Sequence, residues 1–328
     1  MKINMAHGSG GRATNELITE LFADAFSNPV LNAMEDAAVV DGSLRIAMTT
    51  DSFVVEPLEF PGGDIGRLCV CGTVNDLLMR GAKPKYLTCG FVLQEGLEIE
   101  LLRRVVHSLA QTAKEAGVTV VAGDTKVVEG NGGMIINTAG VGFVDEDVAI
   151  SASGCKSGDA ILVSGNLGDH HAAILSRRMG IENTIISDCA PLTEMVHRLL
   201  AEGIHVHCLR DITRGGLGTV LKELAEASNV TMAVDEELLP VDAQVRDFCG
   251  LMGLDPLYMG NEGKLVAFVA PEDADRAVEI IARCPYGADA AVIGQVTDEA
   301  HGNAYVKTAI GGKRVLDVLY GEGLPRIC

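Results

Sequence analysis

The clearest alternation of apolar and polar positions lies between residues 98 and 116. Its apolar side chains, which recur every three or four positions, are Ile99, Leu102, Val105, Leu109 and Ala113. This spacing places them on one face of a helix, and Gly117, which follows directly, is a typical helix end. The pattern predicts an amphipathic helix over 98–116.

The same periodicities and breaker residues predict the remaining elements. In the first half of the chain they predict helices at 12–26 and 66–80, and strands at 44–50, 86–93, 118–121 and 134–144. In the second half they predict strands at 160–164, 206–209, 230–234, 264–269 and 291–296, and helices at 171–178, 192–201, 217–227, 243–252 and 272–284. Strands and helices mix through both halves, which indicates an α+β or α/β protein.

The length of 328 residues favours two domains over a single core. Composition shifts at 151–157, where SASGCKS interrupts the apolar pattern like a linker. We therefore expect an N-terminal domain at 1–150 and a C-terminal α/β domain at 151–320. The last residues, 321–328, read GEGLPRIC and predict a flexible tail.

The formal net charge of −19 disfavours nucleic acid and anionic lipid as partners. A small anion such as ATP could still bind if Mg²⁺ mediated between its phosphates and the carboxylates. The N-terminus lacks an apolar signal core, and no run approaches the ~20 apolar residues of a membrane span. Nine scattered cysteines are typical of free thiols in a reducing compartment, so a cytoplasmic protein is expected.

Two glycine patterns bear on nucleotide binding. Residues 8–13 fit the relaxed dinucleotide pattern G-x-G-x-x-A, but only six residues precede Gly8, too few for the strand which that fingerprint requires. A glycine-rich arm that contacts phosphates and a plain turn both remain open. No G-x-x-x-x-G-K-[ST] stretch occurs, so a P-loop is excluded.

Aspartates lie at the ends of apolar runs in the first half of the chain. They are Asp36, Asp51, Asp76 and Asp124. If they converged at strand ends they would repel one another unless a cation lay between them, which would indicate a metal site. Four separate caps and surface charges are the alternative. Two further strings, DITRGG from Asp211 and NEGKL around Glu262, are unusual, and the first is suited to binding an anion at a helix N-terminus.

Taken together, these strings resemble one superfamily. GSGG, EDAAV, TTDS, GTVNDLLMRGAKP, GDTKVV, DITRGG and NEGKLV follow the order found in the aminoimidazole-synthetase and selenophosphate-synthetase superfamily. Within it, the closing LPRIC resembles the HypE family of hydrogenase maturation, which are carbamoyl dehydratases. The resemblance implies a two-domain fold, with an N-terminal domain that forms a dimeric β-barrel-like core.

The resemblance also implies a reaction and its partners. A carbamoyl group on the sulfur of Cys328 would be dehydrated with ATP to a thiocyanate, which supplies the cyanide ligand for the iron of NiFe hydrogenase. A HypF-like carbamoyltransferase would be the donor, a HypC/HypD-like iron scaffold the acceptor, and the protein would be a homodimer. Eight residues span at most ~28 Å when extended, so the tail could reach both the donor and the ATP site.

Residue roles follow from the same resemblance. The catalytic candidates are Cys328, Lys126 and Glu262, and the cofactor-binding candidates are Gly10, Gly11, Asn75, Asp76 and Asp124. The candidates for Mg²⁺ are Asp36, Asp51, Asp76, Asp124 and Asp211. Lys126 could be a base for the carboxamide or a phosphate contact, and both stay open. Two other functions are alternatives: a superfamily enzyme acting on a diffusible substrate, and a non-catalytic scaffold that presents its cysteine tail.

Overall fold

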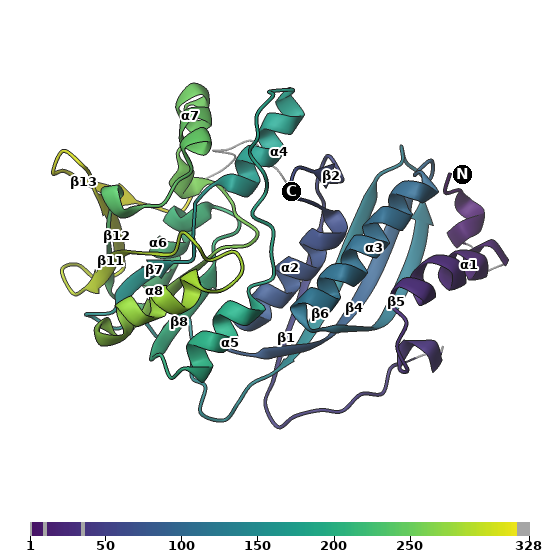
Figure 1. The fold of residues 1–328 in the computed structure, drawn as a ribbon, viewed down its shortest axis with the longest axis horizontal. Helices are drawn as coiled ribbons and strands as arrows, with labels where there is room; N and C mark the ends of the chain where they lie inside the picture. The colour runs from purple at the N-terminus through teal and green to yellow at the C-terminus, as the bar shows by residue number, and fades with distance from the viewer. Residues whose placement is uncertain (1, 9–11, 34–36, 320–328) are drawn as a thin grey trace.

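A computed structural model describes residues 2–8, 12–33 and 37–319 of the chain, and it contains two main β-sheets with helices packed on them (Figure 1). One sheet has four strands in the order β1-β6-β4-β5, and the other has seven in the order β13-β12-β9-β11-β7-β10-β8. The first belongs to the N-terminal half and the second to the C-terminal half. The fold is therefore the two-part α/β arrangement that the sequence predicts.

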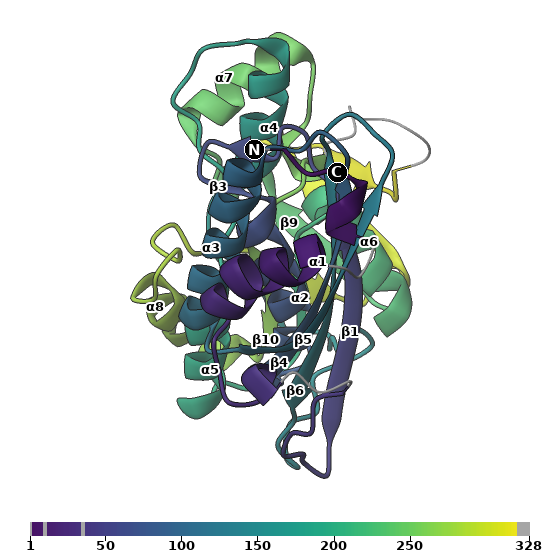
Figure 2. The same ribbon diagram turned by 90° about the vertical axis from the view of Figure 1, so that its right-hand side faces the viewer.

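The N-terminal sheet carries its helices on one face. Its strands are β1 (Ile46–Phe53), β4 (Lys83–Gln94), β5 (Thr119–Val128) and β6 (Met134–Phe143). Against them lie α2 (Ile65–Leu78), α3 (Ile99–Ala116), and α1 (Arg12–Leu17), which continues into the π-helical η2 (Ile18–Ala23). Figure 2 shows α3 beside the strands, and the short hairpin of β2 (Glu59–Phe60) and β3 (Gly63–Asp64) leads into α2.

The opposite face of this sheet is open in the single chain. Ile46 and Met48 on β1 are 50% and 74% exposed, although both are apolar. They alternate with Thr49 and Asp51, whose side chains leave the other face, because successive residues of a strand point to opposite sides. Exposed apolar side chains on a sheet face are typical of a surface that is covered by a partner.

Helix α2 lies between the two halves of the molecule (Figure 1). It begins at the cap Asp64, whose carboxylate accepts a 2.9 Å hydrogen bond from the backbone N–H of Arg67. Nearly all of its residues are buried, from Ile65 to Leu78. A helix that is buried all round has neighbours on every side, and α2 therefore can hold side chains against both sheets at once.

The C-terminal sheet is centred on strands that are buried on both faces. Its strands are β7 (Ala160–Val163), β8 (Val206–Asp211), β9 (Thr231–Asp235), β10 (Leu265–Val269), β11 (Ala291–Thr297), β12 (Asn303–Lys307) and β13 (Lys313–Leu316). Its helices are α4 (Asp169–Met179), α5 (Thr193–Ala201), α6 (Gly216–Ser228), α7 (Ala243–Met252) and α8 (Ala274–Ala282). The 3-10 turns η1 (Met5–Gly8), η3 (Leu31–Ala33), η4 (Glu236–Leu238), η5 (Pro256–Tyr258) and η6 (Pro271–Asp273) complete the described elements.

The structure corrects the sequence prediction at several places. The strand predicted at 118–121 extends to Val128, because β5 pairs in parallel with β4 along its whole length. Asp51 lies inside β1 rather than at its end. Strands β2, β3, β12 and β13 were not predicted. None of the helices in the described residues combines the length and apolar character that a membrane-spanning helix needs.

Candidate active site

Two of the predicted aspartates lie on the same side of the N-terminal sheet. Thr49 and Asp51 are two residues apart on β1, so their side chains leave one face, and the hydroxyl of Thr49 donates a 2.8 Å hydrogen bond to Asp76 on α2. The pKa of Asp76 is raised, first by desolvation and then by the negative charge of Asp51, while the Thr49 hydrogen bond opposes the shift. The negative charge of Asp51 therefore acts on the carboxylate of Asp76.

The C-terminal half adds two acidic groups to this region. Asp211 is the last residue of β8, and desolvation together with the charge of Asp76 raises its pKa to about 6. Glu262 lies in the loop before β10, whose first residue, Leu265, pairs with Asp211. The pKa of Glu262 is raised well above its ordinary range by desolvation and then by the charges of Asp211 and Asp188. Acidic side chains from both halves thus gather at one junction.

Buried carboxylates that lie close together repel one another, and a bound cation relieves that repulsion. Carboxylate oxygens are the ligands that Mg²⁺ prefers, and Mg²⁺ in nucleotide sites keeps several waters and takes only one or two carboxylates. Within the described residues, no three His, Cys, Asp or Glu side chains converge closely enough to hold a metal ion by themselves. The donor set therefore fits Mg²⁺ that is shared with phosphates, and not a closed protein cage.

Asp124 and Lys126 lie elsewhere on the sheet. Strand pairing aligns Asp124 with Gly90 on β4, then with Asn137 on β6, and finally with Ser52 on β1. Asp124 is therefore in register with Ser52, the residue next to Asp51. Neighbouring residues of a strand point to opposite faces, which puts Asp124 on the face away from Asp51.

Both side chains on this face are exposed. Their charged groups, Asp124 Oδ2 and Lys126 Nζ, lie 3.6 Å apart, with side chains 69% and 66% exposed. The single chain does not bring Asp124 and Lys126 together with Asp51, Asp76 and Asp211, and their roles stay predictions.

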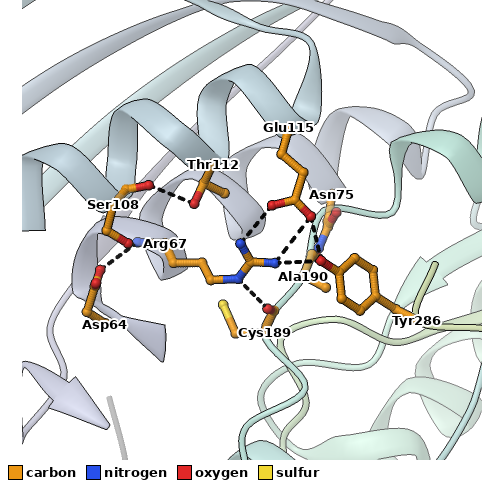
Figure 3. Close-up of polar contacts among 9 residues, drawn as sticks. All are labelled: Asp64, Arg67, Asn75, Ser108, Thr112, Glu115, Cys189, Ala190 and Tyr286. Atoms are coloured by element: carbon orange, nitrogen blue, oxygen red, sulfur yellow. Dashed lines mark hydrogen bonds and ion pairs between the residues drawn. The ribbon is translucent and has the colours of Figure 1, made fainter. Parts of the chain in front are cut away.

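Asn75, a predicted cofactor-binding residue, is 2% exposed and engages the irregular segment before α5. Its Nδ2 donates to the carbonyl of Ala190 at 3.1 Å, and its Oδ1 accepts from the backbone N–H of Leu192 at 2.9 Å. Figure 3 shows Asn75 beside Ala190. The cofactor role of Asn75 stays a prediction, whereas its contacts show a link between the two halves.

Two site neighbours were missed by sequence reasoning. Asp188 accepts hydrogen bonds from the backbone of the Glu262 loop, and Arg67 on α2 binds the carbonyl of Cys189 at 2.7 Å. The segment around Asp188 has neither helical nor strand periodicity, so nothing in the pattern marks it. Among the predicted site residues, Gly10, Gly11, Asp36 and Cys328 lie outside the described residues.

The chain is similar in sequence to known protein families and to individual proteins. Residues 34–144 match the N-terminal domain of AIR synthase related proteins, and residues 156–307 match the C-terminal domain. The carbamoyl dehydratase HypE of Cupriavidus necator is 49% identical over 333 residues, with 100% of this chain and 95% of that protein covered.

Solved structures of HypE proteins are similar to this chain in fold. A crystal structure of the hydrogenase maturation protein HypE in complex with ATP has a TM-score of 0.95 at 46% identity, covering 99% of both chains. A chain in a crystal structure of a HypE–HypF complex has a TM-score of 0.81 at 46% identity, covering 92% of this chain and 99% of that one. The similarity therefore extends over the whole length in sequence and in fold.

Proposed function

The chain belongs to the HypE family of carbamoyl dehydratases, and we propose from this premise that it dehydrates a carbamoyl group on the sulfur of its own Cys328 with ATP. The product is a thiocyanate, which supplies the cyanide ligand for the iron of a NiFe hydrogenase. The observation that carries the proposal is the gathering of Asp51, Asp76, Asp211 and Glu262 at the junction of the two halves, in a chain that matches the family along its full length.

The chemistry explains why such a junction is needed. An amide oxygen is a poor leaving group, so the carbamoyl oxygen takes the γ-phosphoryl group from ATP while the bond to ADP breaks and one N–H proton leaves. The C–O bond then breaks with release of phosphate, the second N–H proton leaves, and the C≡N bond forms. No redox change occurs, and catalysis consists mostly of positioning and of neutralising charge.

Glu262 and Lys126 are the proposed groups that handle the carbamoyl protons. Burial raises the pKa of Glu262 and so favours its protonated form, which can hydrogen-bond an oxygen that gains negative charge. Nearby cations would lower that pKa and allow Glu262 to accept a proton instead. Lys126 is proposed either as base or as phosphate contact.

The nucleotide and its metal share some of their proposed ligands. Asn75, Asp76, Asp124, Gly10 and Gly11 are proposed to contact ATP. For Mg²⁺ the proposed ligands are drawn from Asp36, Asp51, Asp76, Asp124 and Asp211, with one or two carboxylates to each ion. When bound, Mg²⁺ supplies positive charge that offsets the phosphates in a strongly acidic protein.

The proposed partners include a second copy of the chain. The exposed apolar side chains Ile46 and Met48 support a homodimer in which the two open sheet faces form a shared core. The solved complex of a relative with HypF supports a HypF-like carbamoyl donor. A HypC/HypD-like iron scaffold is the proposed acceptor.

The proposed domain bounds are those expected from the sequence. They are an N-terminal domain at 1–150, a C-terminal domain at 151–320 and a tail at 321–328.

Intact-mass spectrometry tests this function directly. Protein carbamoylated by its donor and then given Mg·ATP should lose the mass of one water, and the loss should map to the last peptide. Cys328→Ala should fold and bind ATP like the parent but form no thiocyanate, and Cys328→Ser should not be carbamoylated, because a hydroxyl without an activating base is a poor nucleophile. Water loss that maps to another cysteine would overturn the proposal.

A further inference from the structure

Residues 187–192, called the strap below, form an irregular segment between α2 and the Glu262 loop. The strap has neither helix nor strand structure, yet Cys189, Ala190 and Leu192 are 3%, 0% and 1% exposed. Buried backbone groups must find hydrogen-bond partners. The hydrogen-bond partners of the strap come from both halves of the molecule, and the Glu262 loop is one of them.

On one side, helix α2 holds the strap by two polar side chains. Arg67 and Asn75 are eight residues apart, just over two turns along the helix, and both side chains reach the strap. Arg67 Nε donates to the carbonyl of Cys189 at 2.7 Å, and Asn75 Nδ2 donates to the carbonyl of Ala190 (Figure 3). The other end of the Asn75 amide, Oδ1, accepts from the backbone N–H of Leu192. Asp76, the next residue on α2, receives the Thr49 hydrogen bond. The strap is therefore fixed relative to the carboxylates of the N-terminal half.

On its other side, the strap holds the loop that carries Glu262. Asp188 Oδ1 accepts from the backbone N–H of Glu262 at 3.2 Å, and Oδ2 accepts from that of Gly263 at 3.3 Å. The backbone N–H of Ala190 donates to the carbonyl of Glu262 at 3.3 Å. A Cβ at position 263 would lie 1.9 Å from the carbonyl oxygen of Asp188, so only glycine permits this approach.

We propose that Asp188 is a positioning residue for Glu262, holding its backbone in register with the carboxylates on β1 and α2. This inference rests on the catalytic role proposed for Glu262. A carboxylate that accepts two successive backbone N–H groups fixes both position and orientation, because each bond restricts the loop in a different direction. Misplacement of a reacting group by about 1 Å can lower a rate by roughly 100-fold.

The test is a double-mutant cycle on the dehydration step. Asp188→Asn keeps the size of the side chain but replaces one acceptor oxygen with an NH₂ group that faces a backbone N–H. The single-turnover rate of water loss from carbamoylated protein should fall roughly 10- to 100-fold, while the Kd for Mg·ATP stays within about twofold of the parent value. Asp242→Asn is the control, since Asp242 also accepts a backbone N–H, from Gln244 at 2.8 Å, but outside the strap.

Glu262→Gln completes the cycle and separates the two proposals. If Asp188 acts through Glu262, Asp188→Asn should slow the Glu262→Gln protein little or not at all, because the group that it positions is already gone. Effects that multiply, or an Asp188→Asn protein at the parental rate, would overturn the inference. Glu262→Gln at the parental rate would instead overturn the role proposed for Glu262. If Asp188→Asn does not fold, Asp188→Ser, which keeps one acceptor, takes its place in the cycle.

Discussion

The hydroxyl of Thr49 donates a 2.8 Å hydrogen bond to the carboxylate of Asp76 and so joins strand β1 to helix α2. The neighbouring residue, Asn75, binds the strap from the other half of the molecule. Two consecutive residues of one buried helix therefore have different contacts. Asp76 supplies a carboxylate of the candidate site, and Asn75 binds the strap, which in turn binds the Glu262 loop. Helix α2 is for this reason the structural centre of the candidate active site.

Asp76→Asn should weaken Mg·ATP binding by about tenfold or more. One charge-assisted contact is worth roughly 1.5–3 kcal/mol, and about 1.4 kcal/mol corresponds to a factor of ten. Binding of ATP without metal should not weaken, because the substitution removes a negative charge near the phosphates. Titration calorimetry with Mg²⁺ and with a chelator measures both. The control is Asp145→Asn, which changes an exposed carboxylate paired with Lys83; equal losses in both variants would contradict the Mg²⁺ role.

Met48→Glu should convert the proposed homodimer to a monomer, because pairing two open faces would bury an unpaired charge at each copy. Light scattering coupled to size exclusion measures the mass. Leu251→Glu is the matched control: Leu251 on α7 is 76% exposed and Met48 is 74% exposed, but only Met48 lies on the open sheet face. A parent protein that is already monomeric, or a Met48→Glu protein that remains dimeric, argues against the open face as the interface.

Elements with local periodicity were predictable from sequence, and elements defined by distant pairing were less so. The helix predicted at 98–116 is α3, because its apolar stripe alone determines which face is buried. The strand predicted at 118–121 is longer in the structure, since Gly123 and Asp124 interrupt the apolar run while β4 still supplies hydrogen bonds to that segment. Its extension depends on a partner that is distant in sequence.

The types of residue in the candidate site were predictable from sequence. Which of those residues lie close together in space was less predictable. Asp51 and Asp124 look equivalent in sequence, yet strand register places them on opposite faces of one sheet. Register depends on pairing across four strands, and no local pattern reveals it. Asp188 was missed for a related reason, because its importance comes from backbone groups of a loop more than 70 positions away, as the contact with Glu262 shows.

Arg67→Ala should lower the free energy of unfolding by roughly 2–3 kcal/mol, because a mostly buried guanidinium with several charge-assisted hydrogen bonds is lost. Arg67 contacts Glu115 on α3 at 2.8 Å and the hydroxyl of Tyr286 at 3.1 Å, besides the strap (Figure 3). Tyr286→Phe should cost about 1 kcal/mol, since Tyr286 also donates to Glu115. Urea unfolding measures both changes.

The control for the Arg67 prediction is another arginine–glutamate pair. Arg104 binds Glu59 at 2.7 Å, but its side chain is 57% exposed. Exposed ion pairs contribute little, so Arg104→Ala should change stability much less than Arg67→Ala. Equal effects would mean that burial and the contacts across the two halves do not determine the contribution of Arg67.

Asp169→Asn should stabilise the protein, and the gain should depend on pH. Desolvation, followed by the negative charge of Asp188, raises the pKa of Asp169 from 3.8 to about 7, while Lys264 opposes the shift. One of its carboxylate oxygens is buried and has no hydrogen-bond partner among the described residues. The charged form of Asp169 is therefore unfavourable in the folded state.

The direction of the pH dependence follows from proton binding. Between pH 4 and 7 the folded state keeps the Asp169 proton more often than the unfolded state, so stability falls as pH rises and levels off above about pH 7. Asn cannot ionise, so the Tm difference between Asp169→Asn and the parent should be largest above pH 7 and should shrink toward pH 4. Thermal melts at pH 5 and 8 measure it, with exposed Asp247→Asn as the control. A difference of the same size at both pH values would show that burial of the charge at Asp169 does not limit stability.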